Sequence, residues 1–238
     1  MVKFYESNFT YDYSFPAVAL AYFLRYPNPY STHVLSTDVI SREIDANGRL
    51  HTLRIHRKSS RLPSAVLKLL PKSVLGNVSG GKSESYILET STIDVKEGWM
   101  HTESKNLDWT GILSVVERQE YRRRLPTDEG DDFSVGAGTT GVVTSVKFRS
   151  RLGERFRART AKNYEVDDEP KRGFLAAWST GGIQRSIEAI ASRKTESQLG
   201  KSKEGMKVVL ERLRRGGLVA VLEGMREDRK LGFGHDGA

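Results

Sequence analysis

Positively charged side chains recur in this sequence at spacings that would let them gather around an anion. Arg54, His56 and Lys58 alternate along one segment, and alternating residues of a β-strand share one face. Arg25 and His33 flank a corner that contains two prolines. Guanidinium, ammonium and imidazole groups that converge can donate charge-assisted hydrogen bonds to a phosphate or a carboxylate. The sequence therefore points first to anion binding.

Two lysines extend this pattern into a predicted helix. An apolar stripe at helical spacing begins with Ile183, Ile187 and Ile190, and the same steps lead to Lys194 and Lys201. An ammonium group that faces inward is tenable only beside an anionic partner. The later apolar residues drift to another face of the helix, which leaves a second interpretation in which Lys201 lies at the edge of the stripe.

One formal motif indicates a different chemistry. Residues 76–83 fit the phosphate-binding P-loop of nucleotide hydrolases, and they read Gly76-Asn77-Val78-Ser79-Gly80-Gly81-Lys82-Ser83. That loop requires a buried strand before it and a helix after it. Here a proline-bounded leucine segment precedes the motif and an alternating, strand-like segment follows it. The context therefore argues against a nucleotide hydrolase.

Signals for catalysis and for metal binding are absent from the sequence. There is no nucleophile-elbow pattern, and the histidines lack the spacing of metal ligands. The absence of cysteine excludes disulfides, a thiolate nucleophile and a cysteine-based zinc site. We therefore predict a protein that is not an enzyme, with no catalytic residue, no metal and no cofactor.

The composition describes a basic globular protein. Its 238 residues, 37% of them hydrophobic, can bury a core as one domain with appendages. The formal charge of +8 favours anionic partners, whether nucleic acid, an acidic membrane surface or a phosphorylated ligand. No run approaches the roughly 20 apolar residues of a membrane span, and the first residues lack the features of a secretory signal or a transit peptide.

A predicted helix over residues 14–24 positions Arg25. Ser14 is the candidate N-cap, and Pro16 suits the first turn. Arg25 would then lie in the last turn, where the helix dipole alone favours a cation. Capping of the helix and binding of a ligand are therefore equally open roles for Arg25.

A series of predicted antiparallel strands positions the cationic row. The turn at residues 45–48 contains Asn47-Gly48, and it predicts a hairpin between strands at 33–44 and 50–59. A β-meander follows over residues 83–94, 99–107 and 110–122, with a further strand at 140–151 and a first strand at 2–13. The row could simply face water, which is the common fate of charged strand faces.

Three further segments complete the chain. The short apolar segment 62–70 either packs into the core or forms a mobile flap over a cavity. Residues 152–182 read as an exposed insertion; the basic stretch 151–162 could bind RNA, but the acidic block after it favours a solvated loop. Gly216-Gly217 is predicted to end the long helix, and residues 216–238 to form a loosely ordered tail.

The residues around the corner resemble a known family. The match covers Arg25-Tyr26-Pro27-Asn28-Pro29-Tyr30-Ser31, then His33-Val34, Ile40-Ser41-Arg42, Gly48, Leu50, Lys58-Ser59 and Leu62-Pro63. It continues in Asn106-Leu107-Asp108 and in Lys201-Ser202-Lys203 with Gly205-Met206. The chain thus resembles the PRELI-like family of mitochondrial lipid transfer proteins, nearest to its fungal members that transfer phosphatidic acid.

The resemblance implies an α+β fold of the StART type. In that fold a curved antiparallel sheet wraps around a long C-terminal helix and encloses a lipid cavity, here within a domain at residues 1–215 with the insertion at 152–182. The implied ligands of the lipid headgroup are Arg25, His33, Arg54, Lys58, Lys194 and Lys201. The implied flap, which would contact the membrane, contains Leu62, Val66, Leu67, Leu69 and Leu70.

The function implied by the resemblance is transfer of a phospholipid without chemical conversion. The family members in question carry phosphatidic acid between the outer and inner mitochondrial membranes, in the intermembrane space, and so feed cardiolipin synthesis. The implied partners are an anionic membrane surface and a small twin-cysteine chaperone that forms a heterodimer, with no nucleic acid. Ala65 stands where the phosphatidic acid branch commonly has tryptophan, so phosphatidylserine transfer is the alternative.

Overall fold

The structure, a computed structural model, describes residues 2–61, 78–79, 82–108, 110, 113–124, 138–150 and 180–233. Within the last of these ranges, side chains are described from residue 197. The predicted flap, most of the predicted insertion and the basic stretch 151–162 lie outside the described residues. The insertion was predicted to reach residue 182, but the C-terminal helix already begins at Thr180.

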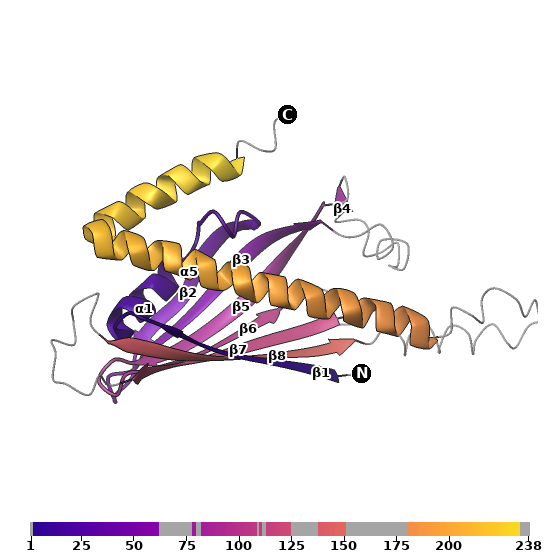
Figure 1. Ribbon diagram of the computed structural model, residues 1–238, viewed down its shortest axis with the longest axis horizontal. Coiled ribbons are helices and arrows are strands. Elements are labelled where there is room, and N and C mark those ends of the chain that lie inside the picture. The colour runs from indigo at the N-terminus through magenta and orange to yellow at the C-terminus, as the bar shows by residue number, and fades with distance from the viewer. Residues whose placement is uncertain are drawn as a thin grey trace, which may run out of the picture.

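A single antiparallel sheet forms most of the described fold. Its strands follow the order β1-β8-β7-β6-β5-β3-β2, and the short β4 pairs with β5. The bounds are β1 Val2–Tyr11, β2 Val34–Ile44, β3 Leu50–Arg61, β4 Val78–Ser79, β5 Lys82–Asp94, β6 Trp99–Asn106, β7 Leu113–Arg124 and β8 Thr139–Ser150. In Figure 1 the sheet curves around the long helix α5, Thr180–Phe233. The predicted curved sheet with a C-terminal helix is confirmed.

The hairpin between β2 and β3 forms as its turn residues require. Gly48 adopts a positive φ of 78°, which suits glycine because it lacks a Cβ atom. The Asp45 carboxylate accepts hydrogen bonds from the backbone amides of Asn47 at 2.8 Å and Arg49 at 2.9 Å. The turn pairs Ile44 with Leu50, and an irregularity between Val39 and Ser41 then shifts the register so that Val39 faces Arg54.

We call the helix-facing side of the sheet the inner face. Its polarity changes from one row to the next, where a row is a line of residues paired across neighbouring strands. One row is apolar and buried, and it consists of Ile93, Met100, Tyr121 and Val142. The next row is polar, and it consists of Thr52, Ser91, Thr102, Gln119 and Thr144. The third row carries charge, and it consists of Arg54, Glu89, Ser104 and Glu117. The sheet therefore has an apolar core at one end and an ionic region further along.

Helix α1, Phe15–Phe23, packs into the apolar end of the inner face and buries Phe15, Val18 and Tyr22. Ser14 occupies the N-cap position as predicted, but its hydroxyl makes no capping hydrogen bond. The helix ends at Phe23 with Leu24 as the C-cap. Arg25 was predicted to lie in the last turn and instead lies just beyond the helix.

The long helix α5 is two helical stretches joined at a sharp bend. Gly216 and Gly217 have non-helical backbone angles, and Gly217 has a φ of 60°. Before the bend the helix buries Met206, Val209 and Leu210 against the core. After the bend the chain continues as a helix and folds back, as the yellow ribbon of Figure 1 shows.

The segment after the bend corrects the predicted loosely ordered tail. Residues 218–233 are helical, and Val221 is fully buried. Arg212 donates hydrogen bonds to Asp228 at 2.6 and 3.2 Å, which joins the two stretches of α5. The glycine pair redirects the helix because Gly217 can take an angle that other residues avoid. Among the described helices, none is both long and apolar enough to span a membrane.

Gly205 on α5 lies against Asn28 of the proline corner. A Cβ atom at this position would lie 2.8 Å from both the Nδ2 and Oδ1 atoms of Asn28, which is buried. Asn28 in turn donates a hydrogen bond to the Arg25 carbonyl at 2.5 Å and accepts one from the Tyr30 amide at 2.9 Å. Any side chain at position 205 would therefore push against the residue that shapes the corner.

We expect Gly205→Ala to lower the free energy of unfolding by about 1–2 kcal/mol, because the cost of overpacking exceeds the gain in helix propensity. The matched control is Gly200→Ala on the same helix, where a Cβ atom meets nothing within 4 Å. That variant should be more stable by roughly 0.5–1 kcal/mol. Chemical denaturation measures both changes. Equal effects of the two variants would contradict the close approach.

Candidate functional site

A buried carboxylate, Glu89 on β5, joins two of the predicted cations. Glu89 is only 1% exposed and Arg54 only 2%. Arg54 donates to Glu89 Oε1 from Nε at 2.8 Å and also from its terminal nitrogen. Arg25 donates to the other oxygen, Oε2. Both guanidinium groups thus converge on one carboxylate from different elements of the fold.

The same arginines also cap the end of α1. Arg54 donates to the Phe23 carbonyl at 3.2 Å, and Arg25 approaches the Tyr22 carbonyl at 3.4 Å. The Arg25 guanidinium stacks over the Tyr22 ring, 3.8 Å from its centroid. A cation at the C-terminal end of a helix is favoured by the helix dipole. The capping role considered for Arg25 is therefore present alongside its contact with Glu89.

His56 completes this cluster, which we call the Glu89 cluster and define as Arg25, Arg54, His56 and Glu89. The His56 Nε2 atom lies 3.2 Å from Glu89 Oε2, and its Nδ1 atom lies 2.9 Å from the Thr37 hydroxyl. Burial lowers the pKa of His56, despite the neighbouring carboxylate. A neutral imidazole at neutral pH leaves two guanidinium groups against one carboxylate, a surplus of one positive charge.

Glu89 is ionised in this cluster. Burial alone would raise the pKa of Glu89, but Arg25, His56 and Arg54 together hold it well below its usual range. Burial likewise opposes the charge on Arg25, and the adjacent Glu89 carboxylate more than offsets that effect and raises the Arg25 pKa. The predicted cationic row therefore faces inward, and an internal anion neutralises part of its charge.

Several buried donors beside the cluster have no hydrogen-bond partner within the described part of the chain. They include the Nε atom of Arg25 and the hydroxyls of Tyr22, Thr52 and Ser91. Thr52 and Ser91 face each other across β3 and β5, one row from Arg54 and Glu89. Unpartnered buried donors cost stability unless something accepts from them. They fit the oxygen atoms of a bound anion, with Arg25 as the charged member.

A second carboxyl group, Glu117 on β7, lies in the same row as Glu89, with Ser104 between them. Burial within the curve of the sheet raises the pKa of Glu117, although part of its surface is accessible, and the positive charge of Lys58 partly opposes this. Lys58 itself is half-buried near the end of β3. The inner face thus carries acidic groups as well as the predicted basic ones.

The remaining predicted headgroup residues are less enclosed or not described. His33 is half-buried, and its carbonyl accepts a hydrogen bond from the Ser59 amide at 2.8 Å, next to Lys58. Lys201 is exposed, which corrects the interpretation that its ammonium group is enclosed. Lys194 lies within α5, but its side chain and the predicted flap lie outside the described residues.

The sequence context argued against a P-loop at residues 76–83, and the local structure agrees. Val78 pairs with Ser83 in an antiparallel arrangement between β4 and β5. Lys82 and Ser83 lie in β5, so a strand stands where the phosphate-binding helix would begin.

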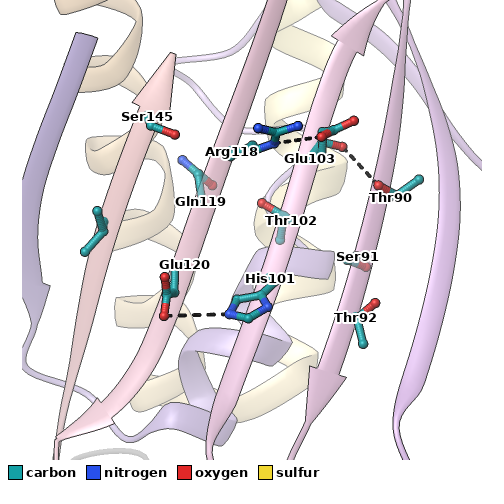
Figure 2. Close-up of a pocket in the computed structure, with 11 residues that line it drawn as sticks. Thr90, Ser91, Thr92, His101, Thr102, Glu103, Arg118, Gln119, Glu120 and Ser145 are labelled. Carbon is teal, nitrogen blue, oxygen red and sulfur yellow. Dashed lines mark hydrogen bonds and ion pairs between the residues drawn. The ribbon is translucent and has the colours of Figure 1, made fainter. Parts of the chain in front are cut away.

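A shallow hollow of about 450 Å³ lies on the outer face of the sheet, opposite the face that carries the Glu89 cluster. Figure 2 shows the side chains that line it, with the helices behind the strands. Its charged groups pair with each other: Arg118 contacts Glu103 at 2.8 Å, and His101 lies 3.7 Å from Glu120. Because these charges are already paired at the surface, we assign no ligand to the hollow.

Comparison with protein families and with characterised proteins gives consistent matches. The profile described as the PRELI-like family matches residues 16–165. "Protein UPS1, mitochondrial" of Saccharomyces cerevisiae is 32% identical over 213 residues, which cover 90% of this chain and 95% of that protein. "Protein ups1 homolog" of Schizosaccharomyces pombe is 36% identical over 68% of this chain and 86% of that protein. Human "PRELI domain-containing protein 1, mitochondrial" is 33% identical over 51% of this chain and 52% of that protein.

Among solved structures, the similarities are more distant. The Zhui aromatase/cyclase of a Streptomyces species has a TM-score of 0.44 and 14% identity, with 92% of this chain and 100% of that chain covered. Ara h 8.0201 has a TM-score of 0.41 and 13% identity, with 89% and 99% covered. At these TM-scores the likeness carries no conclusion about activity.

Proposed function

This chain belongs to the PRELI-like family, and from that premise we propose that it transfers phosphatidic acid between the outer and inner mitochondrial membranes. The mitochondrial names of its relatives support the compartment. The intermembrane space and the supply of cardiolipin synthesis are parts of the same proposal. So is a heterodimer with a small twin-cysteine chaperone.

The observation that carries the proposal is the Glu89 cluster, with its surplus positive charge and the unused Nε donor of Arg25. A phosphate headgroup can accept from that donor and from the adjacent hydroxyls of Thr52 and Ser91. The proposed remaining ligands are His33, Lys58 and Lys194. Each charge-assisted hydrogen bond contributes about 1.5–3 kcal/mol, so the acyl chains must be sheltered as well.

Apolar shelter for the acyl chains is the second requirement. The inner face supplies part of it, because its apolar row is separated from the ionic row by only one polar row. The proposed flap at residues 62–70 would cover the chains and open at a membrane, and its apolar side chains suit that task. No catalytic step is involved, since the lipid is carried unchanged.

We expect phosphatidic acid to co-purify with the protein and to be identified by mass spectrometry of lipids extracted from the full chain. Recovery of phosphatidylserine instead would support the alternative headgroup, because both lipids present a phosphate to Arg25. A preparation that extracts neither lipid from vesicles containing both would refute the proposed function. Retention of RNA by the full chain, with no lipid bound, would favour the RNA-binding alternative.

A further inference from the structure

The helix that follows the glycine bend carries exposed apolar side chains that the fold does not use. Leu218, Val219 and Leu222 are 51%, 66% and 49% exposed. The inward side of the same helix is occupied by Val221, Met225 and Asp228, which contact the core or Arg212. The exposed side chains are therefore not required to hold the helix in place.

Two arginines continue the exposed stripe. Leu218, Leu222, Arg226 and Arg229 follow one another at helical spacing, so they lie along one side of the helix. Arg226 and Arg229 are exposed and form no ion pair with any described residue, whereas Lys230 pairs with Glu227 at 2.8 Å. The stripe is thus apolar near the bend and cationic further along.

We propose that this stripe, defined as Leu218, Val219, Leu222, Arg226 and Arg229, docks the protein on an anionic phospholipid bilayer. An amphipathic helix that combines leucine and valine with arginine suits the headgroup region, where apolar side chains enter the acyl boundary and cations meet lipid phosphates. Unpaired surface cations favour a negatively charged partner, and a bilayer surface accepts the adjoining leucines as well. This docking surface would bring the protein to the membrane for the proposed lipid transfer, and its biological role rests on that proposed function.

The anchoring of this helix gives the docking surface a fixed orientation. Arg212 holds Asp228 through two hydrogen bonds, and Val221 is fully buried. Near the bend, Glu211 accepts from both Arg214 and Arg215, and these contacts lower the pKa of Glu211 to about 2. Glu211, five residues before Gly216, is thus matched by two arginines, which leaves one surplus positive charge there. The exposed Glu223 beyond the bend opposes part of this charge.

The test measures co-sedimentation of the full chain with vesicles of phosphatidylcholine and phosphatidylglycerol in equal amounts. The double variant Val219→Asp/Leu222→Asp is expected to bind these vesicles about tenfold or more weakly than wild type. The matched control is Leu231→Asp: Leu231 is 70% exposed and lies nine residues beyond Leu222, on the opposite side of the helix. That variant should bind like wild type.

A second pair of changes tests the cationic part. Arg226→Ser/Arg229→Ser should weaken binding by roughly 25-fold and reduce the effect of salt, because each arginine near an anionic surface contributes about a factor of five. Equal vesicle binding by wild type and both double variants would overturn the proposal, as would an equal loss in Leu231→Asp. Unchanged vesicle binding with a loss of self-association in the variants would show that the stripe joins two copies of the chain instead.

Lipid transfer is measured in parallel to separate the two proposals. If wild type docks through the stripe but extracts no phospholipid, the proposed function fails and the docking surface stands. If wild type transfers lipid and Val219→Asp/Leu222→Asp docks equally well, the docking surface fails and the function stands. Circular dichroism of each variant checks that the helix is retained.

Discussion

Replacing Glu89 with glutamine is expected to destabilise the fold by about 3–5 kcal/mol, because it leaves two buried guanidinium groups without their anion. Glu89 is 1% exposed and accepts from Arg25 and Arg54. Glutamine has nearly the same shape, so the change isolates the charge. Chemical denaturation at neutral pH measures the loss.

The matched control for this charge removal is Glu103→Gln on the adjacent strand. Glu103 pairs with Arg118 at 2.8 Å, as Glu89 pairs with Arg54, but the Glu103–Arg118 pair is at the surface. Surface pairs contribute roughly 0–1 kcal/mol. A loss in Glu89→Gln no greater than in Glu103→Gln would show that the Glu89 cluster contributes little to stability.

The pH dependence of stability gives an independent check on Glu89. Its folded-state pKa is held well below that of the unfolded chain by Arg25, His56 and Arg54, which outweigh burial. The stabilisation is therefore present above the unfolded pKa of about 4.3 and is lost as the pH falls toward the lower folded value. Wild type should lose stability more steeply below that point than Glu89→Gln. Parallel acid profiles for the two proteins would contradict the assignment.

The second large effect concerns ligand binding and separates the two arginines. Arg54 uses Nε and both terminal nitrogens on Glu89 and Phe23, whereas the Nε donor of Arg25 is unused. Arg25→Gln should therefore lower phosphatidic acid binding by roughly 10- to 100-fold, as expected for the loss of a charge-assisted hydrogen bond. Transfer between vesicles measures this, with the folded fraction determined in the same samples.

Arg54→Gln is the comparison for Arg25→Gln. Its main effect should be on the free energy of unfolding, because Arg54 positions Glu89 and the end of α1. Arg25→Lys should restore part of the binding that Arg25→Gln loses, since it restores the charge without the planar donor group. Unchanged transfer in Arg25→Gln would refute the headgroup role of Arg25.

The strands of this fold were predictable because their signals are local. The turn at Asn47-Gly48 and the alternating segments gave β2, β3, β5, β6, β7 and β8 to within a few residues. The helix after Gly217 was not predicted. Two adjacent glycines ordinarily end a helix, and the burial of Val221 and the pairing of Arg212 with Asp228, which stabilise the helix beyond the bend, are tertiary contacts.

Glu89 was missed for a related reason. Its alternation with Ile87 and Ser91 placed it on one face of a strand, but only the register between β3 and β5 sets it opposite Arg54. Register between strands far apart in sequence is not encoded by spacing alone. The cationic row was therefore predictable, whereas its internal counter-ion required the three-dimensional arrangement.

The pairing of β1 with β8 has a consequence for how the chain acquires its structure. Val2 pairs with Arg149. The backbone groups of β1 can therefore form their sheet hydrogen bonds only after β8 has been made. Long-range pairings of this kind slow folding, since a large loop must close before the contact stabilises it. During synthesis the edge of β7 would stay open until β8 emerges, and an open strand edge invites association with other chains. Newly made copies are therefore expected to be most prone to aggregate before residue 150 leaves the ribosome.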